Sequence, residues 1–385
     1  METVKGFRDY TGEQAQKRAR IKSIIERTFQ LYNFNPIESP IIEYEEFVIG
    51  NNEQDEAVSD RYKLEDKGKR KLALRYEFTF QLKRIAQNKK LPLRVYQIGS
   101  VFRDEPVSLN RLRQITQCDA DIIGSNIKDE AEILKVFSDI LKQLNIQFEI
   151  FINNRKLLNE ILQELKINSE YKQQVIREID KLDKLSESEV KENLKKYNAE
   201  KALEIFKKPE SYFEKYSSYQ EIKALKKQCS NYKLQVKFSP FLARGLSYYN
   251  SSVFEIKTKK IKETICAGGS YLVNGIQATG LSASIERLSI LANIKTSSKK
   301  VLIISLDQDK KAIEISNELR KINIPCNILF GKLSKALDYA NSYNIPYVIF
   351  IGKEELKKKK LKLKDMKTGK EKLLNEKEAI NELSK

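Results

Sequence analysis

The sequence contains no histidine and no tryptophan, and only four cysteines and two methionines among its 385 residues. Without histidine, the chain cannot form a Ser-His-Asp triad, a Cys-His pair, a histidine-ligated zinc site or an imidazole general base. Any chemistry must therefore use carboxylates, arginine, lysine, backbone dipoles or the substrate's own groups.

The few cysteines are also informative. Cys118, Cys229, Cys266 and Cys326 are widely spaced and form no C-x-x-C pair. This spacing predicts neither a metal site made from protein side chains alone nor a secreted disulfide framework. The first residues lack the apolar segment of a signal peptide, and no apolar run approaches the roughly 18 residues of a membrane span. We therefore expect a cytoplasmic protein with no membrane association.

Basic residues outnumber acidic ones, with 71 Lys and Arg against 53 Asp and Glu, which gives a formal net charge of +18. Such an excess favours a polyanionic partner: a nucleic acid, a nucleotide or an anionic membrane surface. The hydrophobic fraction of 41% is sufficient for folded cores. The length suggests about two or three domains.

Patterns along the chain divide it into four segments. An amphipathic helix is expected over residues 13–33, strands over 71–79, 93–102 and 114–124, a helix over 128–144, and a further helix over 279–291. The segment 155–233 is polar, Lys- and Glu-rich and helical in its apolar spacing, so we interpret it as a helical insertion. Residues 301–352 alternate in a βαβαβ pattern that predicts a mostly parallel sheet, followed by a lysine-rich edge or tail. The expected boundaries are 1–154, 155–233, 234–295 and 299–385.

No glycine-rich phosphate loop of either common pattern is present. A nucleotide would therefore be held by side chains, and arginine suits phosphate because it is always charged and bidentate. Arg103, Arg111, Arg244 and Arg287 lie at expected strand ends or beside glycines and aromatics. The alternative for any one of them is a solvated surface charge.

Two carboxylates, Glu77 and Asp121, lie in otherwise apolar strand contexts. A charged group inside a sheet must be paired or functional. A salt bridge to a neighbour such as Arg75 is the structural alternative, and the local sequence leaves both interpretations open.

Taken in order, several segments resemble the histidyl-tRNA synthetases, a family of class II aminoacyl-tRNA synthetases. The first half of the chain carries similarities to motif 1 at 35–40, to the family's Leu-Arg-Tyr-Asp-Leu-Thr segment at 74–79, and to motif 2 at 96–124. The second half carries similarities to the two histidine signatures at 242–249 and 266–271 and to motif 3 at 280–288. Residues 180–185 resemble the archaeal and eukaryotic branch.

The resemblance implies a fold. It implies an α+β class II catalytic core, in which an antiparallel sheet is flanked by helices, with a helical insertion and a small α/β anticodon-binding domain. It implies a histidine–tRNA ligase that uses L-histidine, ATP with Mg²⁺ and tRNA(His), and that forms a homodimer through motif 1.

The resemblance also implies roles for individual residues. Arg103 and Arg244 would be catalytic, with Arg103 on the α-phosphate. ATP would be bound by Arg103, Glu105, Arg111 and Arg287, and the tRNA acceptor end would be met by Arg113. Histidine would be bound by Glu77, Thr79, Gln117, Asp121, Tyr248 and Tyr249.

Four positions depart from the family pattern: Ser247 replaces Asp, Ser270 and Leu272 replace Arg and Asp, and Ala283 replaces Gly. Our hypothesis is that the family's Asp and Arg support each other, so that losing both avoids a stranded buried charge. Two alternatives remain: a synthetase-like paralogue with altered substrate or lost activity, and a regulatory subunit of histidine biosynthesis. The retained arginines and the C-terminal segment argue against the regulatory subunit.

Overall fold

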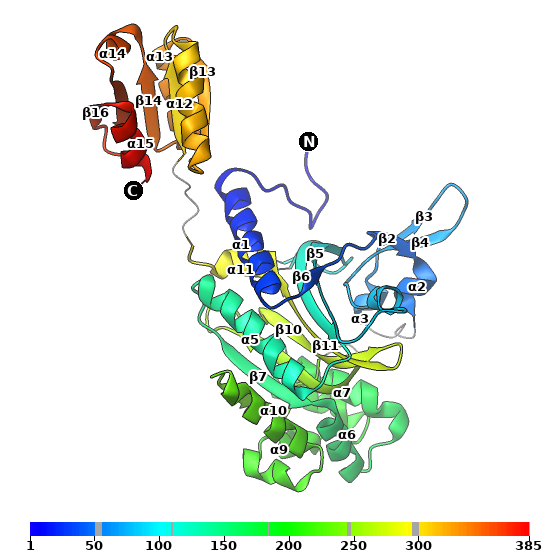
Figure 1. Ribbon diagram of the computed structural model, residues 1–385. Helices are drawn as coiled ribbons and strands as arrows, with labels where there is room; N and C mark the ends of the chain where they lie inside the picture. Colours follow the sequence, from blue (N-terminus) through cyan, green and yellow to red (C-terminus); the bar gives the residue numbers. More distant parts are fainter. Residues whose placement is uncertain (51–55, 109–110, 184, 245–247, 295–299, 385) are drawn as a thin grey trace. The chain divides into compact units, whose positions relative to one another are not determined.

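A computed structural model describes residues 1–50, 56–108, 111–183, 185–244, 248–294 and 300–384. The chain divides into two compact units, Met1–Ile294 and Lys295–Lys385 (Figure 1). Among the described residues, no helix combines the length and the apolar character needed to cross a membrane.

The first unit is built on an eight-stranded sheet of order β1-β5-β6-β11-β10-β9-β7-β8. Its strands are β1 (Asn35–Pro36), β5 (Leu93–Phe102), β6 (Gln114–Ile123), β7 (Glu149–Asn154), β8 (Val236–Phe238), β9 (Tyr249–Lys257), β10 (Cys266–Val273) and β11 (Ile276–Ser284). The outer pairs β1–β5 and β7–β8 are parallel, and every other pair is antiparallel. A small separate sheet contains β2 (Ile42–Tyr44), β4 (Lys71–Leu74) and β3 (Lys63–Glu65).

Alternation along β6 assigns the two faces of the large sheet, because successive strand residues point to opposite sides. Cys118, Ala120 and Ile122 join the main hydrophobic core. The same core contains residues of α1 (Gly12–Leu31), α5 (Ile127–Gln143) and α11 (Ile285–Leu291), which cover that face. Gln117, Asp119 and Asp121 alternate with the core residues and therefore point to the opposite face.

The strands predicted over 93–102 and 114–124 are confirmed as β5 and β6, which pair antiparallel along ten residues each, with Gln97 opposite Asp119. The predicted helix at 128–144 is α5, which begins in a capping box formed by Asn126 and Asp129.

The helix predicted over 279–291 is wrong in its first half. Residues up to Ser284 belong to β11, which pairs with both β6 and β10 in the centre of the sheet. Only from Ile285 does the chain form α11, where the Ser284 hydroxyl accepts a hydrogen bond from the Arg287 amide. The small residues of 278–284 have little preference of their own, and neighbouring strands decide their structure.

The strand predicted over 71–79 is also too long. β4 ends at Leu74, and the next residues leave the small sheet. The Arg75 guanidinium there donates to the carbonyl oxygens of Ser39 (2.6 Å) and Ser100 (2.8 Å). This buried arginine pins the turn that carries Glu77.

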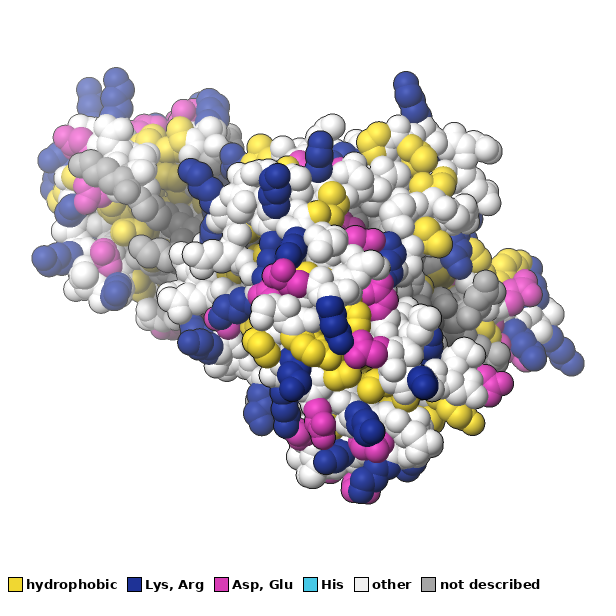
Figure 2. Space-filling model, turned by 90° about the horizontal axis from the view of Figure 1, so that it is seen from below, with side chains coloured by type: hydrophobic (Ala, Val, Ile, Leu, Met, Phe, Trp, Pro, Cys, Tyr) yellow, Lys and Arg dark blue, Asp and Glu magenta, His cyan; other side chains and the backbone are white. Residues whose placement is uncertain are grey.

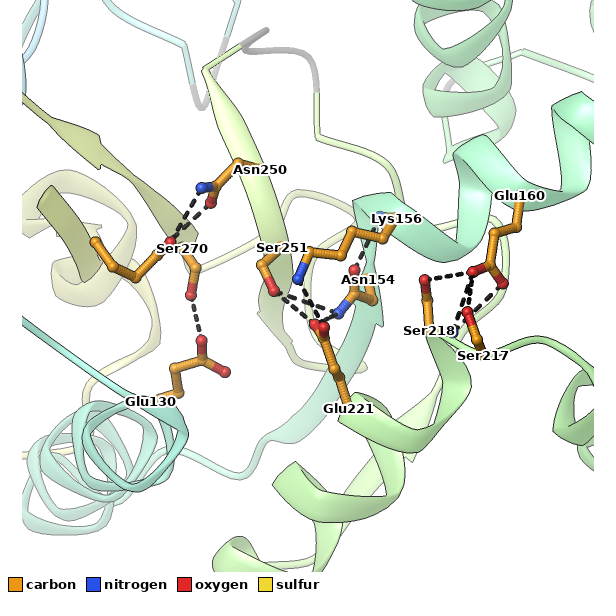
Figure 3. Close-up of polar contacts among 11 residues, drawn as sticks. Glu130, Asn154, Lys156, Glu160, Ser217, Ser218, Glu221, Asn250, Ser251 and Ser270 are labelled. Carbon is orange, nitrogen blue, oxygen red and sulfur yellow. Dashed lines mark hydrogen bonds and ion pairs between the residues drawn. The ribbon is translucent and has the colours of Figure 1, made fainter. Parts of the chain in front are cut away.

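The predicted helical insertion is confirmed in secondary structure, since the described residues between Asn154 and Val236 contain helices and no strand. The helices are α6 (Arg155–Glu164), η1 (Ser169–Tyr171), α7 (Lys172–Asp180), η2 (Lys181–Asp183), α8 (Glu187–Lys195), α9 (Ala202–Phe206), η3 (Glu210–Lys215) and α10 (Tyr219–Asn231). Glu221 of α10 accepts hydrogen bonds from Asn154, Lys156 and Ser251 (Figure 3). This carboxylate links the insertion to the strands β7 and β9.

The second unit has a five-stranded sheet of order β13-β12-β14-β15-β16. Its elements are β12 (Val301–Ser305), α12 (Asp309–Lys321), β13 (Cys326–Phe330), α13 (Leu333–Ser342), β14 (Tyr347–Ile351), α14 (Lys353–Lys357), β15 (Leu361–Asp365), β16 (Glu371–Leu374) and α15 (Glu376–Ser384). The βαβαβ prediction for 301–352 is confirmed. The sheet is mixed, however, because β15 and β16 add antiparallel strands, and the end predicted as a charged edge or tail folds into the domain. Leu361, Leu363 and Leu383 are buried there and explain the difference.

On the face drawn in Figure 2, Lys and Arg side chains are spread among Asp and Glu rather than gathered into one patch. The net charge of +18 therefore does not single out a binding surface on that face.

Candidate active site

One pocket on the face of the large sheet opposite α1 and α5 brings together nearly all of the predicted site residues. It encloses about 980 Å³ of empty space, part of it open to solvent. Its lining includes Glu77, Thr79, Arg103, Glu105, Arg111, Gln117, Asp121, Arg244, Tyr248, Tyr249 and Arg287. These residues come from positions up to 210 apart in the sequence, so the fold gathers them.

Buried carboxylates and tyrosines form one part of the pocket. The Tyr248 hydroxyl donates to Glu77 Oε2 at 3.1 Å and lies 3.5 Å from Thr79 Oγ1. The Tyr271 hydroxyl donates to Asp121 Oδ1 at 2.5 Å. A carboxylate has two oxygens with several acceptor positions, so each can also accept from a donor on a ligand.

Gly280 makes room for one of these carboxylates. A Cβ atom at Gly280, opposite Asp121 in the β11–β6 ladder, would overlap the Asp121 carboxylate. The glycine is needed here for close approach between neighbouring strands.

Asp119 is a site residue that the sequence reasoning missed. It lies on β6 between Gln117 and Asp121 on the same face, is 5% exposed and lines the pocket. Asp119 accepts hydrogen bonds from Gln117 Nε2 (2.8 Å) and Ser282 Oγ (2.6 Å). The two-residue spacing of Gln117, Asp119 and Asp121 along a strand was the signal that could have identified it.

Three of the carboxylates that line the pocket, Glu77, Asp119 and Asp121, share an unusual electrostatic environment. Burial raises the pKa of Glu77 to about 7, although Arg103 opposes the shift. Burial, followed by repulsion from Asp121, raises the pKa of Asp119 to about 8, and burial raises the pKa of Asp121 to about 7. In the pocket without ligand, these three carboxyl groups therefore keep protons near neutral pH. A cationic ligand would favour their ionised form, so the pocket favours such a ligand and its binding would displace the protons.

Arginines form a second part of the pocket. Arg111 Nε lies 2.9 Å from Glu105 Oε2, and Arg103 Nε donates to the Tyr76 carbonyl at 3.1 Å. Arg287 Nη1 donates to the Thr264 carbonyl at 2.7 Å. Burial and then the positive charges of Arg103 and Arg111 lower the pKa of Arg287, although Glu263 opposes the shift. Guanidinium groups held this close favour an anion with several charges.

Arg244 reaches the pocket from the segment before β9. Its backbone lies in the left-handed region, with φ of +62°, which is uncommon for a residue with a side chain. Its Nη1 lies 2.8 Å from Glu255 Oε1. Burial lowers the pKa of the Arg244 guanidinium, but the negative charge of Glu255 outweighs burial and leaves the pKa raised. Buried Arg155 of α6 donates to the carbonyls of Ala243 and Arg244 at 3.1 and 3.4 Å, which helps fix this conformation.

Arg113 is the one predicted site residue that does not line the pocket. Its Nη2 lies 2.9 Å from Asp104 Oδ1, and its Nε donates to the Glu105 carbonyl at 3.2 Å. Through these contacts Arg113 stabilises the loop that carries Glu105.

The positions that depart from the family pattern differ in their surroundings. Ser270 is fully buried, and its hydroxyl donates to Glu130 Oε1 at 2.5 Å (Figure 3). Burial raises the pKa of this carboxyl. Leu272 is exposed, Ala283 lines the pocket, and Ser247 lies outside the described residues. Ser270 is therefore hydrogen-bonded to a buried carboxyl group, that of Glu130. The hypothesis that the family's Asp and Arg were lost together did not include this carboxyl group.

Comparison with known proteins identifies the family. A family model described as histidyl-tRNA synthetase matches residues 6–288, and an anticodon-binding-domain model matches residues 300–385. The chain belongs to the histidyl-tRNA synthetase family. A histidine–tRNA ligase of Bacillus cereus is 32% identical over 411 aligned residues, covering 96% of both proteins. One of Wolinella succinogenes is also 32% identical and covers 96% of this chain and 95% of that protein.

Solved structures of the histidyl-tRNA synthetase family share the fold. A histidyl-tRNA synthetase from Nostoc sp. PCC 7120 has a TM-score of 0.85 at 24% identity, covering 99% of this chain and 98% of the other. A Bacillus halodurans protein titled as an ATP phosphoribosyltransferase regulatory subunit/histidyl-tRNA synthetase has a TM-score of 0.74 at 20% identity, covering 91% and 97%. The class II fold prediction is therefore confirmed. The prediction of an archaeal or eukaryotic-like branch gains no support, because these relatives are bacterial.

Proposed function

We propose that this synthetase activates histidine with ATP to histidyl-adenylate and transfers the histidyl group to the 3′ end of tRNA(His). The observation that supports it best is the single pocket in which buried carboxylates and tyrosines adjoin a group of arginines. The former suit a zwitterionic amino acid with a polar ring, and the latter suit a triphosphate.

In the first step the histidine carboxylate attacks the α-phosphorus of ATP, and pyrophosphate leaves. The carboxylate is already ionised at neutral pH, so the barrier requires alignment and charge stabilisation rather than a general base. Arg103 and Arg244 hold the α-phosphate, Arg111 and Arg287 the outer phosphates, and Glu105 meets the adenine side. No histidine side chain is needed.

Magnesium enters with ATP as part of the substrate. Among the described residues, no cluster of three or more Cys, Asp or Glu side chains could hold a metal ion by itself. Mg²⁺ commonly binds through phosphate oxygens and water with only one or two carboxylates. The pocket fits this mode, because its lining places the carboxylate of Glu286 with the arginines that would hold the phosphates.

Selection of histidine rests on the buried polar groups. Asp121 and Tyr249 face the imidazole, and the α-ammonium lies with Glu77, Thr79, Gln117 and Tyr248. An apolar isostere would leave these buried groups unpaired, a discrimination of about 10⁴–10⁵ in favourable cases.

In the second step the terminal ribose hydroxyl of tRNA(His) attacks the acyl carbon, the acyl–phosphate bond breaks and AMP leaves, and a phosphate oxygen of the departing AMP accepts the hydroxyl proton. The C-terminal unit contacts the anticodon, and Arg113 faces the acceptor end. Residues 1–154 and 234–295 form the catalytic core around the insertion 155–233, and 299–385 form the anticodon-binding domain.

We further propose a cytoplasmic homodimer that forms through motif 1. The supporting observation is an apolar group beside that motif: Ile41, Ile42 and Tyr44 are 44%, 50% and 53% exposed. Large apolar side chains gathered in this way on a surface are typical of an interface.

Histidine-dependent exchange of pyrophosphate into ATP tests the activation step. Arg244→Ala is expected to abolish exchange while the far-ultraviolet circular dichroism at the assay temperature stays close to wild type, although loss of the Glu255 partner should lower the melting temperature. Near-normal exchange in a folded Arg244→Ala protein would remove Arg244 from the mechanism. Exchange measured with each of the twenty amino acids separates a histidine enzyme from an altered paralogue, and absence of exchange with all of them would favour a regulatory subunit.

A further inference from the structure

A second cavity lies on the same face of the sheet as the activation pocket, and nothing in the proposed activation step uses it. Two aromatic rings, Phe151 of β7 and Phe241, line it. Polar groups complete the lining: Ser239, Lys257, Asp180 and Glu255. Its empty space of about 530 Å³, including the open mouth, is large enough for a nucleoside.

Phe241 is held in place although its side chain faces outward. The residue is 43% exposed, which is costly for a phenylalanine in a tight loop. The buried side chain of Asn153 donates both hydrogens of its amide to the two carbonyls that flank Phe241, those of Pro240 (3.0 Å) and Leu242 (2.9 Å). These hydrogen bonds fix the backbone on both sides of Phe241, so the loop needs no further ordering to present the ring for stacking, which lowers the entropic cost of binding.

The same loop continues into the activation pocket. Three residues after Phe241 comes Arg244, whose carbonyl accepts from Arg155. Glu255 lines the second cavity and forms the 2.8 Å ion pair with Arg244. The second cavity therefore adjoins the arginine assigned to the α-phosphate, where the acyl group is transferred.

The chemistry of the lining fits a nucleotide. Aromatic rings stack on nucleobases of any sequence. Lys257 is 30% exposed and pairs with Glu255 Oε2 at 2.8 Å, and the ammonium has three N–H donors, so it can also donate to a phosphodiester oxygen. The Ser239 hydroxyl offers an acceptor for a sugar hydroxyl or for a donor on a base edge.

We propose that this second cavity binds the 3′-terminal nucleotide of the acceptor RNA, with its base stacked on Phe241. The inference rests on the proposed function, because ATP and histidine occupy the activation pocket and the acceptor must reach the same acyl carbon. Phe241 is then a binding residue for the second step alone.

Phe241→Leu and Phe241→Tyr in the full-length protein provide the test. Each variant is assayed for histidine-dependent pyrophosphate exchange, and for single-turnover transfer from preformed histidyl-adenylate to tRNA(His). Loss of the ring in Phe241→Leu is expected to slow transfer at subsaturating tRNA roughly tenfold or more while exchange stays within twofold of wild type. Phe241→Tyr, which keeps the ring, is expected to retain most of the transfer rate.

The outcomes separate this inference from the proposed function. Equal loss of exchange and transfer in Phe241→Leu, or no loss of either, would overturn the inference. Absence of exchange in the wild-type protein would instead refute the proposed function. The trinucleotide CpCpA provides a second measurement. It should inhibit transfer by the wild-type protein competitively with tRNA, and it should inhibit transfer by Phe241→Leu at least several-fold less. Equal inhibition of both proteins would also overturn the inference.

Discussion

Half-buried Arg244 and buried Glu255 form an ion pair, with Nη1 and Oε1 2.8 Å apart, and the other oxygen of the carboxylate lies 2.8 Å from the Lys257 ammonium. The nearby positive charges of Arg244 and Lys257 keep the pKa of Glu255 lowered despite its burial. The ion pair thus fixes a guanidinium whose backbone is in the left-handed region. A side chain fixed before substrate binds needs no ordering during the reaction.

Glu255→Gln is therefore expected to lower the kcat of pyrophosphate exchange by roughly tenfold or more, because a neutral amide holds the guanidinium less firmly. The KM for histidine should change far less. Glu149→Gln is the matched control, since Glu149 pairs with Lys237 at an exposed site on β7. Equal effects of the two substitutions would show that Glu255 does not position Arg244.

The KM for histidine should fall as the pH rises from 6 to 8. The ionised carboxylates attract the substrate ammonium, and the pKa values of Glu77 and Asp121, about 7, and of Asp119, about 8, place their ionisation in this range. Asp119→Asn should shift the midpoint of this profile to lower pH, because Asp119 repels the Glu77 carboxylate. A profile in Asp119→Asn with the wild-type midpoint would contradict the coupling.

Glu130→Gln should stabilise the protein, and more so at higher pH. The pKa of Glu130 is raised in the folded state by burial, so its contribution to stability is complete at low pH and is lost as the pH rises through the folded pKa. Glutamine carries no such penalty. Melting temperatures between pH 5 and pH 8.5 measure the difference, which should be smallest at pH 5. A difference that stays constant over this range would exclude ionisation of Glu130 as its cause.

Gly280→Ala should raise the KM for histidine by roughly tenfold or more. The added Cβ overlaps the Asp121 carboxylate, which must move away from its position beside Tyr271. The KM for ATP serves as the internal control and should change little, because the arginines lie elsewhere in the lining. Parallel increases in both constants would indicate a general distortion of β11.

Elements with a strong pattern of their own could be predicted from the sequence. The amphipathic α5 and α12 and the strands β5 and β13 occur where periodicity and alternation placed them. β11 could not be predicted, because its small residues have weak preferences and its strand structure depends on pairing with β6 and β10. The turn after β4 is likewise determined by Arg75, whose partners lie 25 and 36 residues away in sequence.

The candidate site shows the same division. Residue types and motif order identified Glu77, Asp121 and the arginines, because the chemistry of a phosphate or an amino acid restricts which side chains can bind it. Asp119 and Tyr271 were missed. Their importance comes from strand register and from a hydrogen bond between residues 150 positions apart.

By itself the sequence determined that no chemistry here can depend on a histidine side chain of the enzyme, and it determined the order of the motifs and the helical character of the insertion. The tertiary structure decided which carboxylates share one pocket, that Arg113 does not line it, and that Phe241 and Arg244 lie on one pinned loop beside two cavities. The reason is physical: local preference and residue chemistry act over a few residues, whereas burial, repulsion between carboxylates and the fixing of a guanidinium depend on neighbours that only the folded chain brings together.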